Sequence, residues 1–320
     1  MKGQLSLQKT KNQKNNRSIV NYILWFVFIA VCILFSIISK NFLTKVNIIN
    51  IITQVSITGI LSIGMTYVII TGGIDLSVGS IVALSGIAAA FAARAGYGLW
   101  IPILLALAVG VIIGGIINGL LIAKCGLQPF IVTLATMEIA RGLAMILTHA
   151  ADIYGLGDTF VKPLTIRFFD VPFPAICFIV LMLLAILFER KSPVSRRIFA
   201  IGDNEKSALL AGLPVTRVKI FVYMMSGMFA AISGILLTAK IAAAEPNMGD
   251  GYELTAIGAV VIGGTSLSGG KGTILGTVFG VFLFGILTNG MNLLNIPSYY
   301  QTVVKGVVII FAVLLDKLRK

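Results

Sequence analysis

The chain has 320 residues, of which 58% are hydrophobic and 12% are charged. Soluble domains carry roughly 25% charged residues, so the composition excludes a set of soluble domains and indicates a polytopic membrane protein. The net charge of +13 does not indicate nucleic acid binding, because the lysines and arginines lie between apolar runs, where membrane topology places them. We therefore expect no nucleic acid partner.

The apolar runs predict an all-α protein with about ten transmembrane helices, since roughly 20 apolar residues span the hydrocarbon core. Several runs are shorter than that, which predicts Gly-broken or re-entrant segments. Glycines within the runs, such as Gly110, Gly114 and Gly115, are expected to let neighbouring helices approach closely. In chain order the predicted helices are 19–38, 48–70, 78–93, 99–122, 127–148, 171–188, 219–241, 254–266, 273–289 and 299–315.

The basic residues predict the orientation of the chain. With ten crossings and a cytoplasmic N-terminus, 17 lysines and arginines fall on the cytoplasmic side and six fall outside, as the positive-inside rule requires. Both termini are therefore expected in the cytoplasm. The predicted parts are a disordered cytoplasmic tail over 1–18, a single transmembrane domain over 19–316 with a cytoplasmic loop over 189–219, and a cytoplasmic tail over 317–320.

Two copies of the pattern GGxxLS lie 191 residues apart, and each follows an apolar run. Transporters commonly consist of duplicated halves, and Gly-interrupted segments at matching positions mark the transport path. A chance match is the alternative, because glycine and serine are abundant in this chain. The path candidates from the two copies are Gly72, Gly73, Asp75, Ser77, Gly263, Gly264, Ser266 and Ser268.

Polar residues inside the predicted helices form a second group of path candidates. Glu138 and Arg141 lie three residues apart on one helix, where they either pair as a structural ion pair or line the path. Asn118, Asn289 and Asn292 serve either as hydrogen-bonding links between helices or as groups that bind a polyol. The sequence Gly270-Lys271-Gly272 lacks the hydroxyl residue of a phosphate-binding loop. We expect no catalytic residue, cofactor or metal site.

The cytoplasmic loop contains a short amphipathic helix over 203–213 in our prediction, capped by Asp203 or Asn204 and ended by Gly212-Leu213-Pro214. Such a helix fits a socket on a partner, whereas a solvated connection is the alternative. On the opposite side, predicted loops carry acidic residues, which form either a docking rim for an extracytoplasmic partner or an ordinary solvated surface. These acidic residues are Asp152, Asp158, Asp170, Glu245, Asp250 and Glu253.

Four segments resemble the permease subunit of monosaccharide-importing ABC transporters, and the similarity covers about 20–316. They are GGIDLSVGS (72–80), AIGDNEKSALLAGLP (200–214), GYELTAIGAVVIGGTSLSGGKGTILGT (251–277) and NGMNLLNIPSYYQTVVKGVVIIFAVLLD (289–316). The resemblance implies a multi-pass protein of a bacterial plasma membrane, surrounded by lipid. It also implies a second permease copy as a homodimer or pseudo-dimer, a cytoplasmic ATPase and an extracytoplasmic sugar-binding protein.

By the same resemblance, the ATPase contacts the loop through residues in and around its short helix. Asp203 departs from the family, whose members commonly have a second glycine there. The coupling candidates are Gly202, Asp203, Asn204, Glu205, Ala208, Gly212, Leu213 and Pro214.

The expected function is import of a monosaccharide by alternating access, driven by ATP hydrolysis on the separate subunit, with no covalent chemistry in this chain. Ribose is the cargo that the resemblance favours, and other pentoses, hexoses or a furanosyl signalling molecule stay open. The alternative is a self-energised secondary transporter or channel for a small polar solute. A proton-coupled carrier needs a titrating carboxylate in the membrane, and Glu138 is the one that lies clearly inside a predicted helix.

Overall fold

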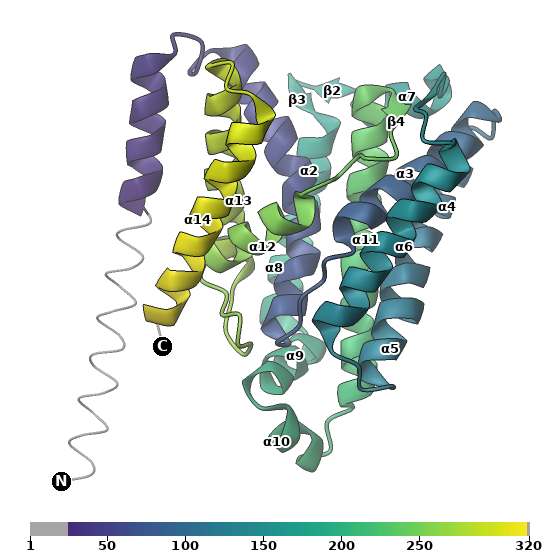
Figure 1. Cartoon of the computed structure of the whole chain (residues 1–320), viewed down its shortest axis with the longest axis vertical. Helices are drawn as coiled ribbons and strands as arrows, with labels where there is room; N and C mark the ends of the chain where they lie inside the picture. The colour runs from purple at the N-terminus through teal and green to yellow at the C-terminus, as the bar shows by residue number, and fades with distance from the viewer. Residues whose placement is uncertain (1–24, 319–320) are drawn as a thin grey trace.

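A computed structural model describes residues 25–318, and they form a bundle of helices with two small strand pairs (Figure 1). The helices are Trp25–Ile38, α2 Lys45–Ile70, α3 Val78–Arg94, α4 Trp100–Val111, the π-helix Ile112–Gly119, α5 Leu120–Ala123, α6 Pro129–Thr148, α7 Asp158–Thr165, α8 Phe173–Lys191, α9 Pro193–Asp203, α10 Glu205–Leu210, α11 Val215–Ile241, α12 Tyr252–Ile262, α13 Ile274–Leu293 and α14 Ser298–Leu318. The strands are β1 Ile153–Tyr154, β2 Arg167–Phe168, β3 Val171–Pro172 and β4 Ala243–Ala244.

Six helices of the described chain are long and apolar enough to cross a membrane: α2, the continuous helix Trp100–Ala123, α6, α8, α11 and α13. Four shorter apolar helices accompany them: Trp25–Ile38, Val78–Arg94, Tyr252–Ile262 and Ser298–Leu314. Every predicted range overlaps one of these helices. The predicted helix over 254–266 is too long at its end, because the chain leaves the helix at Gly263. The predicted tail over 1–18, the part of the predicted helix 19–38 before Trp25, and residues 319–320 lie outside the described residues.

The centre of the bundle is formed by α2, α11 and α13, which are mostly buried, whereas less than a third of α6 and of α8 is buried. A helix that is apolar all round and buried belongs to the interior of a bundle. The exposed faces of α6 and α8 carry leucine, isoleucine and valine, the side chains that contact lipid tails. This pattern is that of a bundle whose outer surface faces a bilayer.

The predicted close packing at glycine is confirmed where the α4 and π-helix segment crosses α11. A Cβ on Gly110 or on Gly114 would clash with the α11 backbone, at the carbonyls of Gly227 and Tyr223 respectively. A Cβ on Gly115 would lie 2.9 Å from the Cβ of Met224 on the same helix. The two backbones therefore touch along a seam that only glycine permits.

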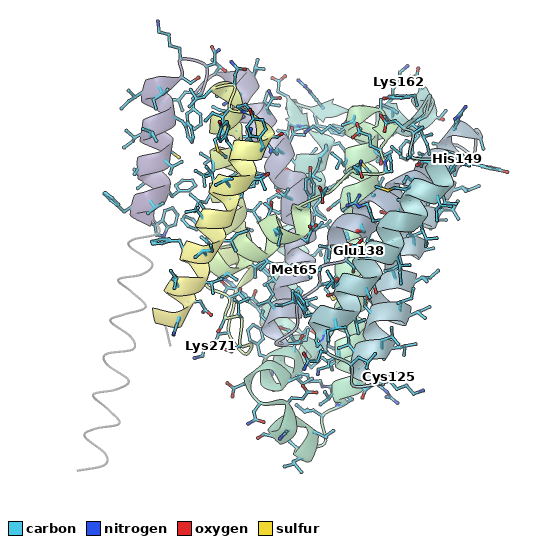
Figure 2. The ribbon with its side chains drawn as sticks, viewed as in Figure 1. Met65, Cys125, Glu138, His149, Lys162 and Lys271 are labelled. Atoms are coloured by element: carbon cyan, nitrogen blue, oxygen red, sulfur yellow. The ribbon has the colours of Figure 1, made fainter. Side chains whose placement is uncertain are left out.

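The two ends of the bundle differ in structure. At one end lie α9, α10, the end of α14 and the loop that carries Lys271, and at the other lie α7 and the strand pairs (Figure 1; Figure 2 labels Lys271 and Cys125 at the first end, Lys162 and His149 at the second). Both strand pairs are antiparallel, β1 with β4 and β2 with β3. The sequence indicated loops here, apart from β3, which the predicted helix over 171–188 included, since two-residue strands and an eight-residue helix leave little periodic signal.

Candidate functional site

Each GGxxLS copy ends a helix in the same way. In the first copy Gly72 takes φ +78° and the N–H of Gly73 donates to the carbonyl five residues earlier, at 3.0 Å. In the second copy Gly264 takes φ +94° and the N–H of Thr265 makes the equivalent bond at 3.2 Å. This is the Schellman arrangement, which favours glycine at the left-handed position. The two copies share the geometry but are shifted by one residue within the pattern.

After the first break, the fully buried carboxylate of Asp75 gathers three hydrogen bonds. The N–H and the hydroxyl of Ser77 donate to one oxygen, at 3.1 and 2.6 Å, and the hydroxyl of Ser226 on α11 donates to the other at 2.8 Å. The network continues from the Ser77 hydroxyl to Asn118 of the π-helix at 2.9 Å. Asn118 in turn accepts from Thr136 of α6 at 2.7 Å. The structure thus brings Asp75, Ser77 and Asn118 together and links four elements.

The second break opens into a loop over 263–273 that is compact. Ser266 is buried, its N–H donates to the carbonyl of Lys271 at 2.9 Å, and its hydroxyl lies 3.0 Å from that of Ser268. A Cβ on Gly263 would clash with the backbone of Gly276 in the first turn of α13. The part of this irregular backbone around Thr265 and Ser266 is buried in protein, the condition under which a membrane tolerates it, whereas Ser268, Lys271 and Thr273 are exposed.

The coupling segment, as we call α9, α10 and the chain up to Pro214, contains one short helix, α10. Asn204 caps it by accepting from the N–H of Ser207 at 2.9 Å, which confirms one of the two predicted caps. Asp203 is not the cap, because it is the last residue of α9. Gly212 adopts φ +77° and ends the segment. The helix is therefore shorter than the predicted 203–213, since the chain changes direction between α9 and α10.

The surface of α10 carries two residues that the prediction missed. Leu209 and Leu210 are 65% and 89% exposed, whereas Ala208 faces inward and is buried. Glu205 is tied to α11 by an ion pair with Lys219, 2.6 Å between the charged atoms. The signal in the sequence was the adjacent apolar pair within a polar loop. Of the other predicted coupling residues, Asp203, Asn204, Glu205 and Gly212 are exposed, and Gly202, Leu213 and Pro214 are half-buried.

Glu138 and Arg141 do not form the ion pair that their spacing allows, since their charged atoms do not come within 4.0 Å of each other. Instead the Arg141 guanidinium donates to the carbonyls of Pro246 and Met248, at 2.6 and 3.0 Å. It thereby ties α6 to the segment between β4 and α12. Glu138 is exposed on α6 (Figure 2). Helical spacing identified a shared face but not the backbone carbonyls that compete for the guanidinium.

The two asparagines of α13 link helices to one another. Asn289 and Asn47 of α2 exchange amide hydrogen bonds at 2.8 and 2.9 Å, and both are buried. Asn292 accepts from Gln301 of α14 at 2.8 Å. The contacts of Asn289 match the linking role among the two alternatives for these side chains.

At the opposite end of the bundle, five of the six acidic residues of the predicted rim are exposed, and Glu253 is buried in the first turn of α12. The hydrogen bond from Lys45 to Asp170, at 2.8 Å, lowers the pKa of that carboxyl. The hydrogen bond from Tyr154 to Asp152 raises the pKa of the phenol. This end therefore presents exposed carboxylates, and two of them, Asp170 and Asp158, pair with Lys45 and Lys162.

Known proteins are similar to this chain along nearly its whole length. The ribose import permease protein RbsC of Bacillus subtilis (strain 168) is 47% identical over 293 residues, covering 91% of this chain and 90% of the relative. The protein of the same name from Haemophilus influenzae is 40% identical over 314 residues, covering 96% and 97%. The D-allose transport system permease protein AlsC of Escherichia coli (strain K12) is 40% identical over 293 residues, covering 91% and 89%.

No solved structure matches this chain. Among the described residues, no group of three or more histidine, cysteine, aspartate or glutamate side chains is placed to hold a metal ion. The family described as branched-chain amino acid transport system / permease component matches residues 47–313. The apolar helices and the Gly-broken segments are consistent with this match, and so are the relatives. The chain therefore belongs to this family of integral membrane permeases.

Proposed function

We propose that this chain is the membrane subunit of an ABC importer that moves ribose into the cytoplasm, with ATP hydrolysed on a separate subunit. The observation that carries the proposal is the identity of 40–47% to ribose import permeases over at least nine-tenths of this chain. The family description refers to amino acids, but these relatives are named for ribose. Apolar helices occupy most of the described chain, which leaves the hydrolysis of ATP to a partner.

The topology we propose has ten crossings with both termini in the cytoplasm. The end with α9 and α10 then faces the cytoplasm, and the end with α7 and the strand pairs faces outward. The excess of lysine and arginine on the first side supports this orientation. The exposed acidic residues at the second end support a docking rim for an extracytoplasmic sugar-binding protein.

The transport path in this proposal follows the Gly-broken segments, where polar groups replace lipid-facing apolar ones. Asp75, Ser77 and Asn118 form the buried polar network beside the first break.

A charged side chain at the bilayer centre costs roughly 2.5–3.5 kcal/mol on insertion scales. We therefore place the exposed Glu138 of α6 against a second copy of the chain, at the boundary of the path, rather than in lipid.

The ATPase contact we propose centres on α10, the helix that extends furthest from the bundle at that end (Figure 1). Two adjacent exposed leucines on a cytoplasmic helix favour insertion into an apolar socket, since burying each leucine is worth about 2 kcal/mol. The Glu205–Lys219 ion pair and the Asn204 cap hold the helix in place.

Replacement of both leucines tests the contact. In the Leu209→Ser, Leu210→Ser double variant, we expect co-purification of the ATPase to fall at least tenfold. ATP-driven ribose uptake into proteoliposomes that contain the complete transporter falls with it. The variant removes only exposed side chains, so the chain itself is expected to insert and fold as before.

The matched control is Phe169→Ser, which removes a fully exposed aromatic ring at the opposite end. This control is expected to keep the ATPase. Retention of the ATPase by the double variant contradicts the contact. Ribose uptake by the unmodified chain without any ATPase contradicts the proposed function and favours a secondary transporter or channel.

A further inference from the structure

Three backbone segments that are distant in sequence meet beneath the centre of the bundle. They are the end of α2 at Ile70, the end of α9 at Gly202 and the second Gly-rich loop at Gly269 and Gly270. The N–H of Gly270 donates to the carbonyl of Ile70 at 2.9 Å. A Cβ on Gly269 would lie 2.7 Å from the carbonyl oxygen of Gly202 and 3.1 Å from the nitrogen of Gly72. Both Gly-broken segments and the coupling segment therefore touch at one place.

No side chain fits on the three glycines at this meeting point, which are Gly202, Gly269 and Gly270. A Cβ on Gly202 would clash with the carbonyl of Ile70 and would lie 2.6 Å from the nitrogen of Gly270. Gly269 and Gly270 also adopt φ +84° and +72°, a region that strains other residues. Close approach and left-handed backbone are independent reasons for glycine, and both apply here.

The coupling segment is firmly attached at this point. Ile198 and Ile201 of α9 are buried in the core, and the hydroxyl of Ser195 donates to the carbonyl of Glu189 at 3.1 Å. The carboxylate of Glu189 accepts from the N–H of Ile274 at 2.8 Å, which fixes the start of α13 to the end of α8. Packed and hydrogen-bonded contacts therefore link α9, which precedes α10, to the end of α2 and to the second loop.

We propose that Gly202, Ile70, Gly269 and Gly270 form a backbone joint that moves as one body and carries the motion of α9 and α10 to both Gly-broken segments. This inference rests on the proposed function and deepens it. Gly202 is then a positioning residue that faces inward, and it does not contact the ATPase. Contact with the ATPase and transmission of its movement are thus performed by different residues of the same segment.

Gly202→Ala tests the joint in the complete transporter with its ATPase and binding protein. The added methyl group forces Ile70 and Gly270 apart but leaves the exposed surface of α10 unchanged. We expect co-purification of the ATPase and its ATP hydrolysis to stay within twofold of the unmodified transporter. ATP-driven ribose uptake is expected to fall at least tenfold. The matched control is Gly306→Ala, whose Cβ meets open space, and it is expected to keep its uptake.

The outcomes separate the joint from the proposed function. Uptake by the Gly202→Ala variant at the level of the control overturns the joint. Loss of ATPase co-purification in that variant also overturns it, because Gly202 is then part of the contact. Failure of the unmodified chain to need ATP overturns the proposed function itself.

Hydrogen exchange on the unmodified transporter decides the matter if the variant fails to fold. The Gly270 N–H belongs to the joint through its bond to Ile70. A joint that moves as one body keeps this amide protected both without nucleotide and with ATP trapped. Exchange at least tenfold faster in the trapped state means that the joint opens during transport, and it overturns the proposal.

Discussion

The carboxylate of Asp75 is fully buried, and its hydrogen bonds offset the free-energy cost of burying a charged group. Its two oxygens accept from a backbone N–H and two serine hydroxyls. Burying a charge without partners is expensive, whereas a connected network satisfies each group. Because the network also includes Asn118, the geometry of the first break depends on single side chains from three other elements.

At this scale we predict that Asp75→Ala lowers the free energy of unfolding by about 3 kcal/mol, because buried donors lose their acceptor. Unfolding of the purified chain in detergent, followed by circular dichroism, measures the change. Asp158→Ala is the control, since its ion pair with Lys162 is exposed and contributes no more than about 0.5 kcal/mol. Equal losses in the two variants contradict the role of the network.

The π-helix is the element that positions Asn118. Single-turn π-bulges are the usual form, often at functional sites, whereas this π-helix spans eight residues, Ile112–Gly119. Its buried face consists largely of glycine and packs on α11, where Gly114 lies against Gly227. The seam fixes both the distance between the helices and the direction in which Asn118 points, so packing at one glycine pair supports hydrogen bonds several residues away.

Gly227→Ala is therefore expected to lower the free energy of unfolding by about 1–3 kcal/mol, because its methyl group clashes with the carbonyl of Gly110. Gly142→Ala on α6 is the matched control. Its Cβ meets open space, and the substitution is expected to stabilise the helix by about 0.5–1 kcal/mol. Thermal unfolding of the two variants in the same detergent compares them. A loss of stability in both variants, or in neither, contradicts the close packing of α11 against the α4 and π-helix segment.

At the scale of the whole molecule, the two ends have different chemistry. The end with α9 and α10 has the exposed Cys125 beside it (Figure 2). The other end has exposed acidic residues and Lys162, whose side chain is 73% exposed. The proposed orientation assigns the first end to the cytoplasm and the second to the outside.

Labelling with a membrane-impermeant maleimide tests this orientation. Variants with one cysteine each, either the native Cys125 or Lys162→Cys, are compared in intact cells and in inverted vesicles. We expect Lys162→Cys to react in cells and Cys125 to react only in inverted vesicles. Reaction of Cys125 in intact cells contradicts the proposed orientation. It then places α10 outside the cell, where it cannot contact a cytoplasmic ATPase.

Local features of this chain were predictable because they depend on neighbouring residues. The apolar runs located the helices to within a few residues, and Asn204 was one of the two residues predicted as the cap from their type and position. The Gly-Gly pairs were recognised as breaks for the same reason. The helix ending at Ile262 was predicted too long, because a glycine pair allows several exit points from a helix.

The sequence by itself determined that this is a membrane protein of apolar helices with two Gly-broken segments, since composition and local pattern set those features. Only the tertiary structure decided which polar groups meet. Asp75 and Ser226 are 151 residues apart, Asn47 and Asn289 are 242 apart, and Arg141 binds carbonyls more than 100 residues away. Such contacts follow from how whole helices pack, and packing is a property of all the facing surfaces at once.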